Sequence, residues 1–183
     1  MAGYRIMLTF IQFITEKAEY KAQEGKTSVV HHASDQDFTE FRPLSHFGTA
    51  SAARARAVSL GKTHEPKKLY TARIRTGNVV RIGDDAENHT PASILHSLHK
   101  AGHVSIGHYI KMDDKMRAAS SEGERTKLLT DFLKRRKINT ITYKNRVEDP
   151  GSTSYIITHP SQVRLLRKTT APINVERGKS KLK

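Results

Sequence analysis

Apolar positions along the chain follow two spacings, one of three to four residues and one of two, which predict helices and strands respectively. The helical spacing is clearest in a stretch whose apolar face carries Leu128, Leu129, Phe132 and Leu133. Thr90 and Pro91 form a typical helix start, with the threonine as cap and the proline in the first turn. We predict helices at residues 5–24, 51–60, 90–102 and 123–137.

Short runs of β-prone residues predict strands that are bounded by turns at Gly77-Asn78 and Pro150-Gly151. Phe38 and Phe41 lie three positions apart, which predicts one helical turn over residues 35–41 that pins this segment to the core. We predict strands at residues 27–31, around Phe47, and at 68–74, 79–82, 139–144 and 154–158, with 162–166 as strand or coil.

Strands and helices do not alternate regularly in this prediction, and the chain has no Gly-x-Gly-x-x-Gly motif. A doubly wound nucleotide-binding fold is therefore disfavoured. We predict an α+β domain with antiparallel sheets over residues 27–166. Residues 1–26 are expected to form an N-terminal helical arm that packs on the domain or on a partner, and residues 167–183 a basic, flexible tail.

The chain is strongly basic, with a formal net charge of +14 over 183 residues. Such an excess favours polyanions, which include nucleic acid, an acidic protein or an anionic cofactor, although a generally basic protein is an equally open interpretation. The absence of cysteine excludes disulfides, thiolate nucleophiles and cysteine-ligated zinc. No apolar run approaches about 18 residues, so we expect no transmembrane helix.

Three separated segments share one form, in which a β-prone run ends in polar side chains and a turn or helix follows. They lie at residues 29–34, 45–49 and 145–163. The end of a strand is a rigid place to mount a polar side chain beside a cleft. We therefore predict that the three segments line one pocket.

The order and chemistry of these segments resemble the pocket of the histidine-containing ADP-ribosyltransferases, a group that includes the poly-ADP-ribose polymerases. His32-Ala33-Ser34 resembles their His-Gly-Thr/Ser motif. Residues 45–49, before an alanine-rich helix, are similar to their second motif, in which an aromatic residue on a strand flanks nicotinamide.

Residues 154–163 resemble the last sheet motif of the same family. The pattern Tyr-x-Asn-x-x-Glu at residues 143–148 is similar to ADP-ribosyltransferase domains of bacteriophage and mobile-element proteins. The start of the chain, at residues 8–16, also resembles the opening of some bacteriophage proteins. The resemblance to the enzyme family spans roughly residues 27–166.

The resemblance implies split antiparallel β-sheets with flanking helices and an NAD-dependent mono-ADP-ribosyltransferase. NAD would be the substrate, and the acceptor a host protein or a nucleic acid. The location would be the host cytoplasm or a virion, and the N-terminal helix would offer a contact to other phage proteins. The implied catalytic residues are His32, which would bind a ribose hydroxyl, and Glu148. The implied NAD-binding residues are Ala33, Ser34, His46, Phe47, Asn145 and Ser154, with Arg42 and Arg54 as candidates for the pyrophosphate.

Three positions depart from the family pattern. Ala33 replaces the usual glycine, which is tolerable where the backbone does not need a positive φ. His46 replaces the usual tyrosine. Ser154 stands at the position of the catalytic glutamate of the polymerases, so that the nearest acids are Glu148 and Asp149 in the preceding loop. Because serine supplies no charge, we predict that Glu148 is the active carboxylate.

Each candidate also has a plain structural interpretation. His32 fits a strand-end histidine satisfied by backbone, and Phe47 a core residue. Asn145 fits a turn residue that bonds its own backbone, and Glu148 a solvated loop acid. Two alternative functions stay open: a catalytically inactive basic binding or virion protein on the same fold, and RNA 2′-phosphotransferase chemistry.

Other groups of residues carry less specific signals. Five histidines lie between residues 89 and 108, but no His-Glu-x-x-His motif and no acid at a ligand-like spacing accompanies them. We therefore predict no metal site. The basic run at residues 134–137 suits phosphate binding, and it equally suits a solvated helix C-terminus, where cations are favoured by the helix dipole.

Overall fold

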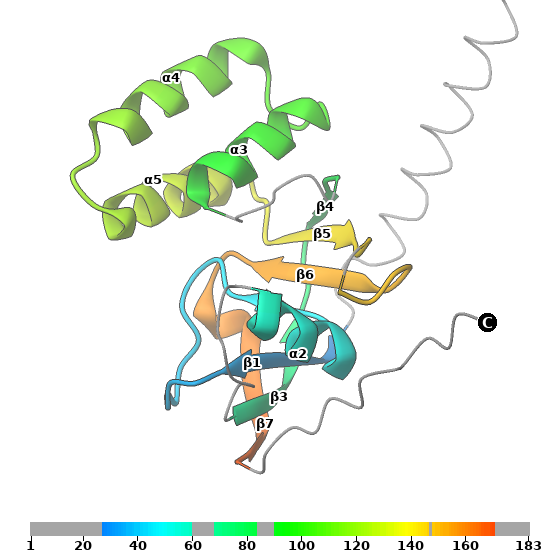
Figure 1. Cartoon of the computed structure of the whole chain (residues 1–183). Helices are drawn as coiled ribbons and strands as arrows, with labels where there is room; N and C mark the ends of the chain where they lie inside the picture. The colour runs from blue at the N-terminus through cyan, green and yellow to red at the C-terminus, as the bar shows by residue number, and fades with distance from the viewer. Residues whose placement is uncertain (1–26, 60–67, 84–89, 147, 171–183) are drawn as a thin grey trace, which may run out of the picture.

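Two β-sheets and four α-helices make up the described part of the chain, which comprises residues 27–59, 68–83, 90–146 and 148–170 of a computed structural model (Figure 1). The predicted α+β class is confirmed at this level. The first sheet has the order β1-β3-β7 and is antiparallel, with strands β1 (Thr27–Ser34), β3 (Lys68–Arg75) and β7 (Val163–Thr169). The second sheet has the order β2-β6-β5-β4, with strands β2 (His46–Phe47), β6 (Thr153–Ile157), β5 (Thr140–Lys144) and β4 (Val79–Arg81).

One strand pair departs from the antiparallel prediction. Strand β4 runs parallel to β5, whereas β2 and β5 both run antiparallel to β6. The turn at Gly77 takes the chain from the first sheet to the second, so β3 and β4 do not form a hairpin. A parallel neighbour needs a long crossover, and the three helices that follow β4 supply it.

The two sheets bury a shared apolar cluster. The first sheet contributes Val30, Tyr70, Ala72 and Ile74, and the second contributes Phe47 and Ile157. The alternation along β6 separates its two faces, because Ile157 joins this cluster while Ile156 joins the core beneath the helices. The second sheet is therefore covered on both faces.

Three helices gather on the other face of the second sheet (Figure 1). They are α3 (Pro91–Lys100), α4 (Ile106–Ala118) and α5 (Glu122–Arg135). Thr90 caps α3 as predicted, since its side chain accepts a hydrogen bond from the Ser93 amide. Helix α4 was not predicted, because only Met112 and Met116 are buried along it and its other apolar residues do not mark a face.

Helix α2 (Ala50–Ser59) packs on the outer face of the first sheet, where Ala53 contacts a small cluster around Leu69 and Ala33. Thr49 caps its first turn by accepting a hydrogen bond from the Ala52 amide at 3.1 Å. Small alanine side chains let the helix approach the strands closely. The helix thereby ends up beside the strand ends that carry the predicted site.

The predicted helical turn over residues 35–41 is wrong. Tyr70 takes the backbone groups that such a turn would use: its hydroxyl donates to the Gln36 carbonyl at 2.9 Å and accepts from the Phe38 amide at 3.3 Å. The predicted contact with the core is correct, because the Phe38 ring stacks on Tyr70 with centroids 4.2 Å apart. An aromatic contact from β3 has replaced the local hydrogen bonds of a helix.

The predicted end of the domain at residue 166 falls inside a strand. Strand β7 continues through Thr169, so the first residues of the predicted flexible tail are paired with β3. The N-terminal arm at residues 1–26 and the tail beyond residue 170 lie outside the described residues. None of the described helices has the length and apolar character that crossing a membrane requires.

Candidate functional site

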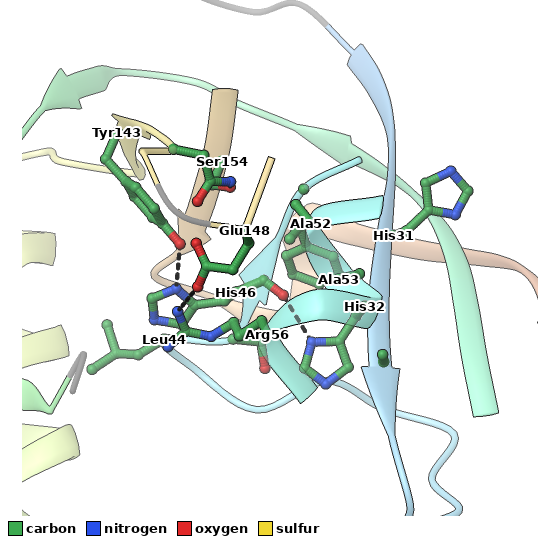
Figure 2. Close-up of a pocket in the computed structure, with 15 residues that line it drawn as sticks. His31, His32, Leu44, His46, Ala52, Ala53, Arg56, Tyr143, Glu148 and Ser154 are labelled. Atoms are coloured by element: carbon green, nitrogen blue, oxygen red, sulfur yellow. Dashed lines mark hydrogen bonds and ion pairs between the residues drawn. The ribbon is translucent and has the colours of Figure 1, made fainter. Parts of the chain in front are cut away.

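The three segments singled out from the sequence meet at one cavity of about 280 Å³ between β1, β2, α2 and the loop that joins β5 to β6 (Figure 2). Both predicted catalytic residues, His32 and Glu148, line it. Most of the predicted NAD-binding residues line it too, namely Ala33, His46, Phe47, Asn145 and Ser154. The predicted convergence of the three segments is therefore confirmed, while the roles of the residues stay predictions.

The two sheets touch at the floor of this cavity. His31 and Gly48 exchange backbone hydrogen bonds of 2.8 and 3.0 Å, which ties β1 to the end of β2. A side chain at Gly48 would place its Cβ 3.1 Å from both the Ala52 Cβ and the Ser154 Oγ. The close approach of strand, helix and β6 at this point therefore favours glycine, because any Cβ here would push its neighbours apart by a few tenths of an ångström.

His32 is held by its backbone neighbours and by aromatic rings. Its Nδ1 lies 2.7 Å from the His46 carbonyl oxygen. Because a carbonyl accepts, Nδ1 carries the proton in this contact. The imidazole centroid lies 5.7–5.8 Å from the centroids of Phe38, Phe41 and Phe47. These contacts fix the orientation of the ring.

The loop from Asn145 to Ser152, here called the acid loop, is closed by its own backbone. The Asn145 amide donates to the Ser152 carbonyl, and the Gly151 amide donates to the Asn145 carbonyl, both at 2.9 Å. Gly151 has a φ of +87°, which favours glycine at this turn. The closed loop carries its two acidic side chains toward α2.

Both acids of the loop bond to α2 or its cap. The Glu148 carboxylate lies 3.4 Å from Nη1 of Arg56, and Figure 2 shows the two groups facing one another. The Asp149 carboxylate accepts a hydrogen bond of 2.5 Å from the Thr49 hydroxyl, the group that caps the helix. Helix α2 and its cap therefore hold the acid loop at two points, and one of them, the Arg56–Glu148 contact, lines the cavity.

Asn145 and Ser154 form a buried polar pair beneath the acid loop. Both are 3% exposed, and the Asn145 side-chain amide donates to the Ser154 Oγ at 2.5 Å. The Asn145 Oδ1 is buried and has no hydrogen-bond partner among the described residues. An acceptor of this kind at the wall of a cavity suits a donor group on a ligand.

His46 and Tyr143 complete the wall on the side of the second sheet. The Tyr143 hydroxyl lies 3.3 Å from Nδ1 of His46, and both side chains meet near Glu148 in Figure 2. Phe47 differs from His46, because it is 2% exposed and its ring packs in the core. The core interpretation of Phe47 thus describes its packing, although the residue also borders the cavity.

Three of the candidate residues are not where the sequence predicted them. Ser34 does not line the cavity: β1 continues to this residue, and its hydroxyl accepts a hydrogen bond from the Gln36 amide instead. Arg42 and Arg54 also lie outside the lining. Arg54 is beside His31, and burial together with the charge of Arg54 lowers the pKa of the His31 imidazole.

Arg56 and Tyr143 line the cavity but were not assigned roles from the sequence. A signal for Tyr143 was present, since it opens the Tyr-x-Asn-x-x-Glu pattern. Arg56 had none that separates it from Arg54, because both stand in the same alanine-rich run and only the rotation of α2 decides which one faces the cavity.

The histidines between α3 and α4 serve local structure. His99 Nδ1 donates to the Val104 carbonyl at 2.8 Å and its ring stacks on Tyr109, and His103 Nε2 donates to the Arg81 carbonyl at 2.8 Å. Within the part of the chain that the structure describes, no group of three or more metal-binding side chains is present.

Comparisons with known proteins identify no family. No protein-family model matches the chain, and no curated protein is similar to it at a significant level. Among solved structures, the chain is similar to a crystal structure of an anti-CRISPR protein, with 13% sequence identity and a TM-score of 0.35. The match covers 76% of this chain and 96% of the other. Likeness at this level carries no argument about function.

Proposed function

We propose that this protein is an NAD-dependent mono-ADP-ribosyltransferase of the histidine-containing type, with split sheets of the kind found in that family. The observation that carries the proposal is that His32 and Glu148, 116 residues apart in the sequence, line the same cavity. The acceptor in this proposal is a host protein or a nucleic acid.

The chemistry of the lining residues suits cleavage of the bond between ribose and nicotinamide. This bond breaks through a transition state with oxocarbenium character, as in glycoside hydrolysis. A carboxylate near the ribose stabilises the developing positive charge and orients a ribose hydroxyl. In the proposal Glu148 is this carboxylate, His32 binds a ribose hydroxyl, and the backbone at Ala33 holds the carboxamide.

The size and polarity of the cavity support binding of one end of the dinucleotide. At about 280 Å³ it lies near the lower end of small-molecule sites, which span about 300–1,000 Å³. The nicotinamide and its ribose would be enclosed, and the adenosine would lie outside. The buried Asn145 Oδ1 would accept a hydrogen bond from the carboxamide or from a ribose hydroxyl.

Arg56 would act as a positioning residue. Its contact with Glu148 keeps the carboxylate at the cavity mouth, where the two side chains are 20% and 14% exposed. A single contact of 3.4 Å is longer than a good charge-assisted hydrogen bond, which spans about 2.7–2.9 Å, so it is weak. The carboxylate can therefore exchange this partner for a ribose hydroxyl when substrate binds.

Glu148→Gln tests the proposal. The change removes the charge but keeps the shape, so we expect ADP-ribose transfer from labelled NAD, or NAD hydrolysis, to fall by at least about 10²-fold. The circular dichroism spectrum and the unfolding midpoint should stay close to those of the wild type. Glu40→Gln removes the same charge at an exposed position outside the cavity and should keep full activity.

The proposal fails if activity survives Glu148→Gln, or if the wild type transfers and hydrolyses nothing in the presence of host extract, DNA and RNA. The second outcome favours the alternative, a catalytically inactive basic binding or virion protein. One observation motivates that alternative: Ser154, at the usual glutamate position, is buried against Asn145 and brings no charge. Binding of NAD without turnover would then be the expected property of the cavity.

A further inference from the structure

The outer face of the first sheet carries a row of arginines. Residues of β3 with odd numbers point to this face, and α2 covers only the end near Leu69. Beyond the helix no described element covers this face, and Val29 on it is 56% exposed. The exposed cations of this face, here called the arginine face, are Arg73 and Arg75 on β3 and Arg164 and Arg167 on β7.

The strand register sets two of these charges against each other. Arg73 and Arg164 are direct cross-strand partners, and Arg167 is opposite Thr71 on the same face. Like charges directly opposite one another in a sheet are destabilising. None of the four arginines makes an ion pair with another described residue, and strands β1, β3 and β7 contain no acidic residue.

At the opposite end of the same strands, two lysines are neutralised by an acidic side chain. Lys68 on β3 and Lys168 on β7 both bond to Asp37, which lies in the loop after β1. The fold therefore pairs its cations where an acid is within reach. Among the described residues, the positive charge of the arginine face is uncompensated, and a polyanion is the ligand that such a field attracts.

The residue types on the face distinguish among polyanions. Arginine binds phosphate through paired N–H donors, which makes it the preferred cation for nucleic-acid backbones. Single-stranded nucleic acids are usually held by stacking of bases on aromatic rings. The outward positions of β1, β3 and β7 hold no Phe, Tyr or Trp. Recognition through phosphates alone suits a duplex, whose bases are already stacked.

The row continues beyond the sheet. Arg75 also lines a groove of about 550 Å³, where Lys134 of α5 supplies a further exposed cation and His159 and Asn139 supply polar groups. Asp131 is the acid of this groove, and it is paired with Lys127. A basic track thus leads from β7 across β3 to the end of α5.

We propose that the arginine face binds the phosphate backbone of a double-stranded nucleic acid, independently of base sequence. The proposal rests on residues outside the cavity and does not depend on NAD cleavage. With four arginine contacts, the logarithm of the binding constant should fall with that of the salt concentration with a slope of about −3.6. Affinity should then drop about 10²-fold between 50 and 200 mM salt.

The test is fluorescence anisotropy of the full chain with labelled 20-base-pair duplex DNA, duplex RNA and a single strand, across that salt range. The double variant Arg73→Gln/Arg164→Gln should reduce the magnitude of the slope by about 2 and weaken duplex binding about 10²-fold at 50 mM salt. Its unfolding free energy should equal or exceed that of the wild type, because a like-charge pair is removed.

The matched control is Lys111→Gln/Lys115→Gln on α4, which removes the same two charges at exposed positions far from the sheet. Equal loss of binding in both double variants would show that net charge alone acts, and would overturn the proposal. So would tighter binding to the single strand than to either duplex, equal binding to polyglutamate, or no binding at 50 mM salt. Glu148→Gln should bind normally, which separates this outcome from a failure of the NAD proposal.

Discussion

The two walls of the cavity are built by different forces. On one wall, His32 is fixed by packed rings, and two of these, Phe41 and Phe47, are 5% and 2% exposed. On the other wall, Glu148 sits on the acid loop, which is held by backbone hydrogen bonds, the Thr49–Asp149 bond and one ion pair. Ring packing and one hydrogen bond to the His46 carbonyl secure the histidine, whereas polar contacts alone secure the acid.

This difference separates a fixed group from an adjustable one. A ring enclosed by close-packed aromatic side chains has few alternative positions, because moving it opens voids. Polar contacts at a partly exposed rim are worth little net free energy and exchange readily with water or ligand. Substrate would therefore meet a preformed wall formed by His32 and the rings around it, here called the histidine wall. The acid loop would adjust to the substrate.

Phe47→Ala breaks the histidine wall and should have the largest effect on stability. Truncating a fully buried phenylalanine leaves a cavity, and we expect a loss of about 3–5 kcal/mol in the free energy of unfolding. Urea denaturation followed by circular dichroism measures it. Phe47→Leu retains most of the volume and should lose clearly less.

A loss below about 1 kcal/mol for Phe47→Ala would contradict the comparison, since it would mean that the rings around His32 do not depend on close packing. The result matters for the site as well. If Phe47 supported only a bound nicotinamide, its removal would change NAD affinity and leave the unfolding free energy of the free protein unchanged.

Asn145→Ala removes a side-chain contact beneath the acid loop and should have an intermediate effect on the free energy of unfolding. The change leaves the buried Ser154 hydroxyl without its donor, and we expect a loss of about 1–3 kcal/mol. A double-mutant cycle with Ser154→Ala isolates the contact, and the coupling energy should fall within about 0.5–3 kcal/mol. Strictly additive losses would show that the Asn145–Ser154 bond does not hold the loop.

The same contrast explains which parts of the molecule the sequence predicts well. The segments around His32, His46 and Glu148 are predictable, because each is a short strand or turn with local signals and all three share the same form. Helix α3 is predictable from its Thr90-Pro91 start. In these cases local chemistry and tertiary packing favour the same structure.

The predictions are wrong where a residue distant in the sequence determines the local structure. Tyr70, on β3, takes the backbone groups of residues 35–41 and prevents the helical turn. Whether Arg54 or Arg56 faces the cavity depends on how α2 rotates against Leu69 and Ala33. The continuation of β7 past residue 166 depends on pairing with β3, which a run of basic residues does not signal.

The pH dependence of stability gives the smallest of the expected effects. It concerns Asp37, in the loop that follows β1. Hydrogen bonds from Lys168 and Lys68 lower the pKa of the Asp37 carboxyl to about 2, from an ordinary value of 3.8. A depressed pKa means that the unfolded chain binds the proton more readily, so the contribution of Asp37 is complete above pH 3.8 and disappears as the pH falls toward 2. Asp37 is exposed, which keeps that contribution small.

We expect Asp37→Asn to be slightly less stable than the wild type at pH 6 in urea denaturation, and the two proteins to converge by about pH 2. Asp114→Asn, at an exposed position of α4 without an ion pair to a described residue, is the control for loss of a charge. A difference between Asp37→Asn and wild type that persists unchanged at pH 2 would assign the effect to packing of the loop rather than to its ion pairs, and both sides of the histidine wall would then depend on packing alone.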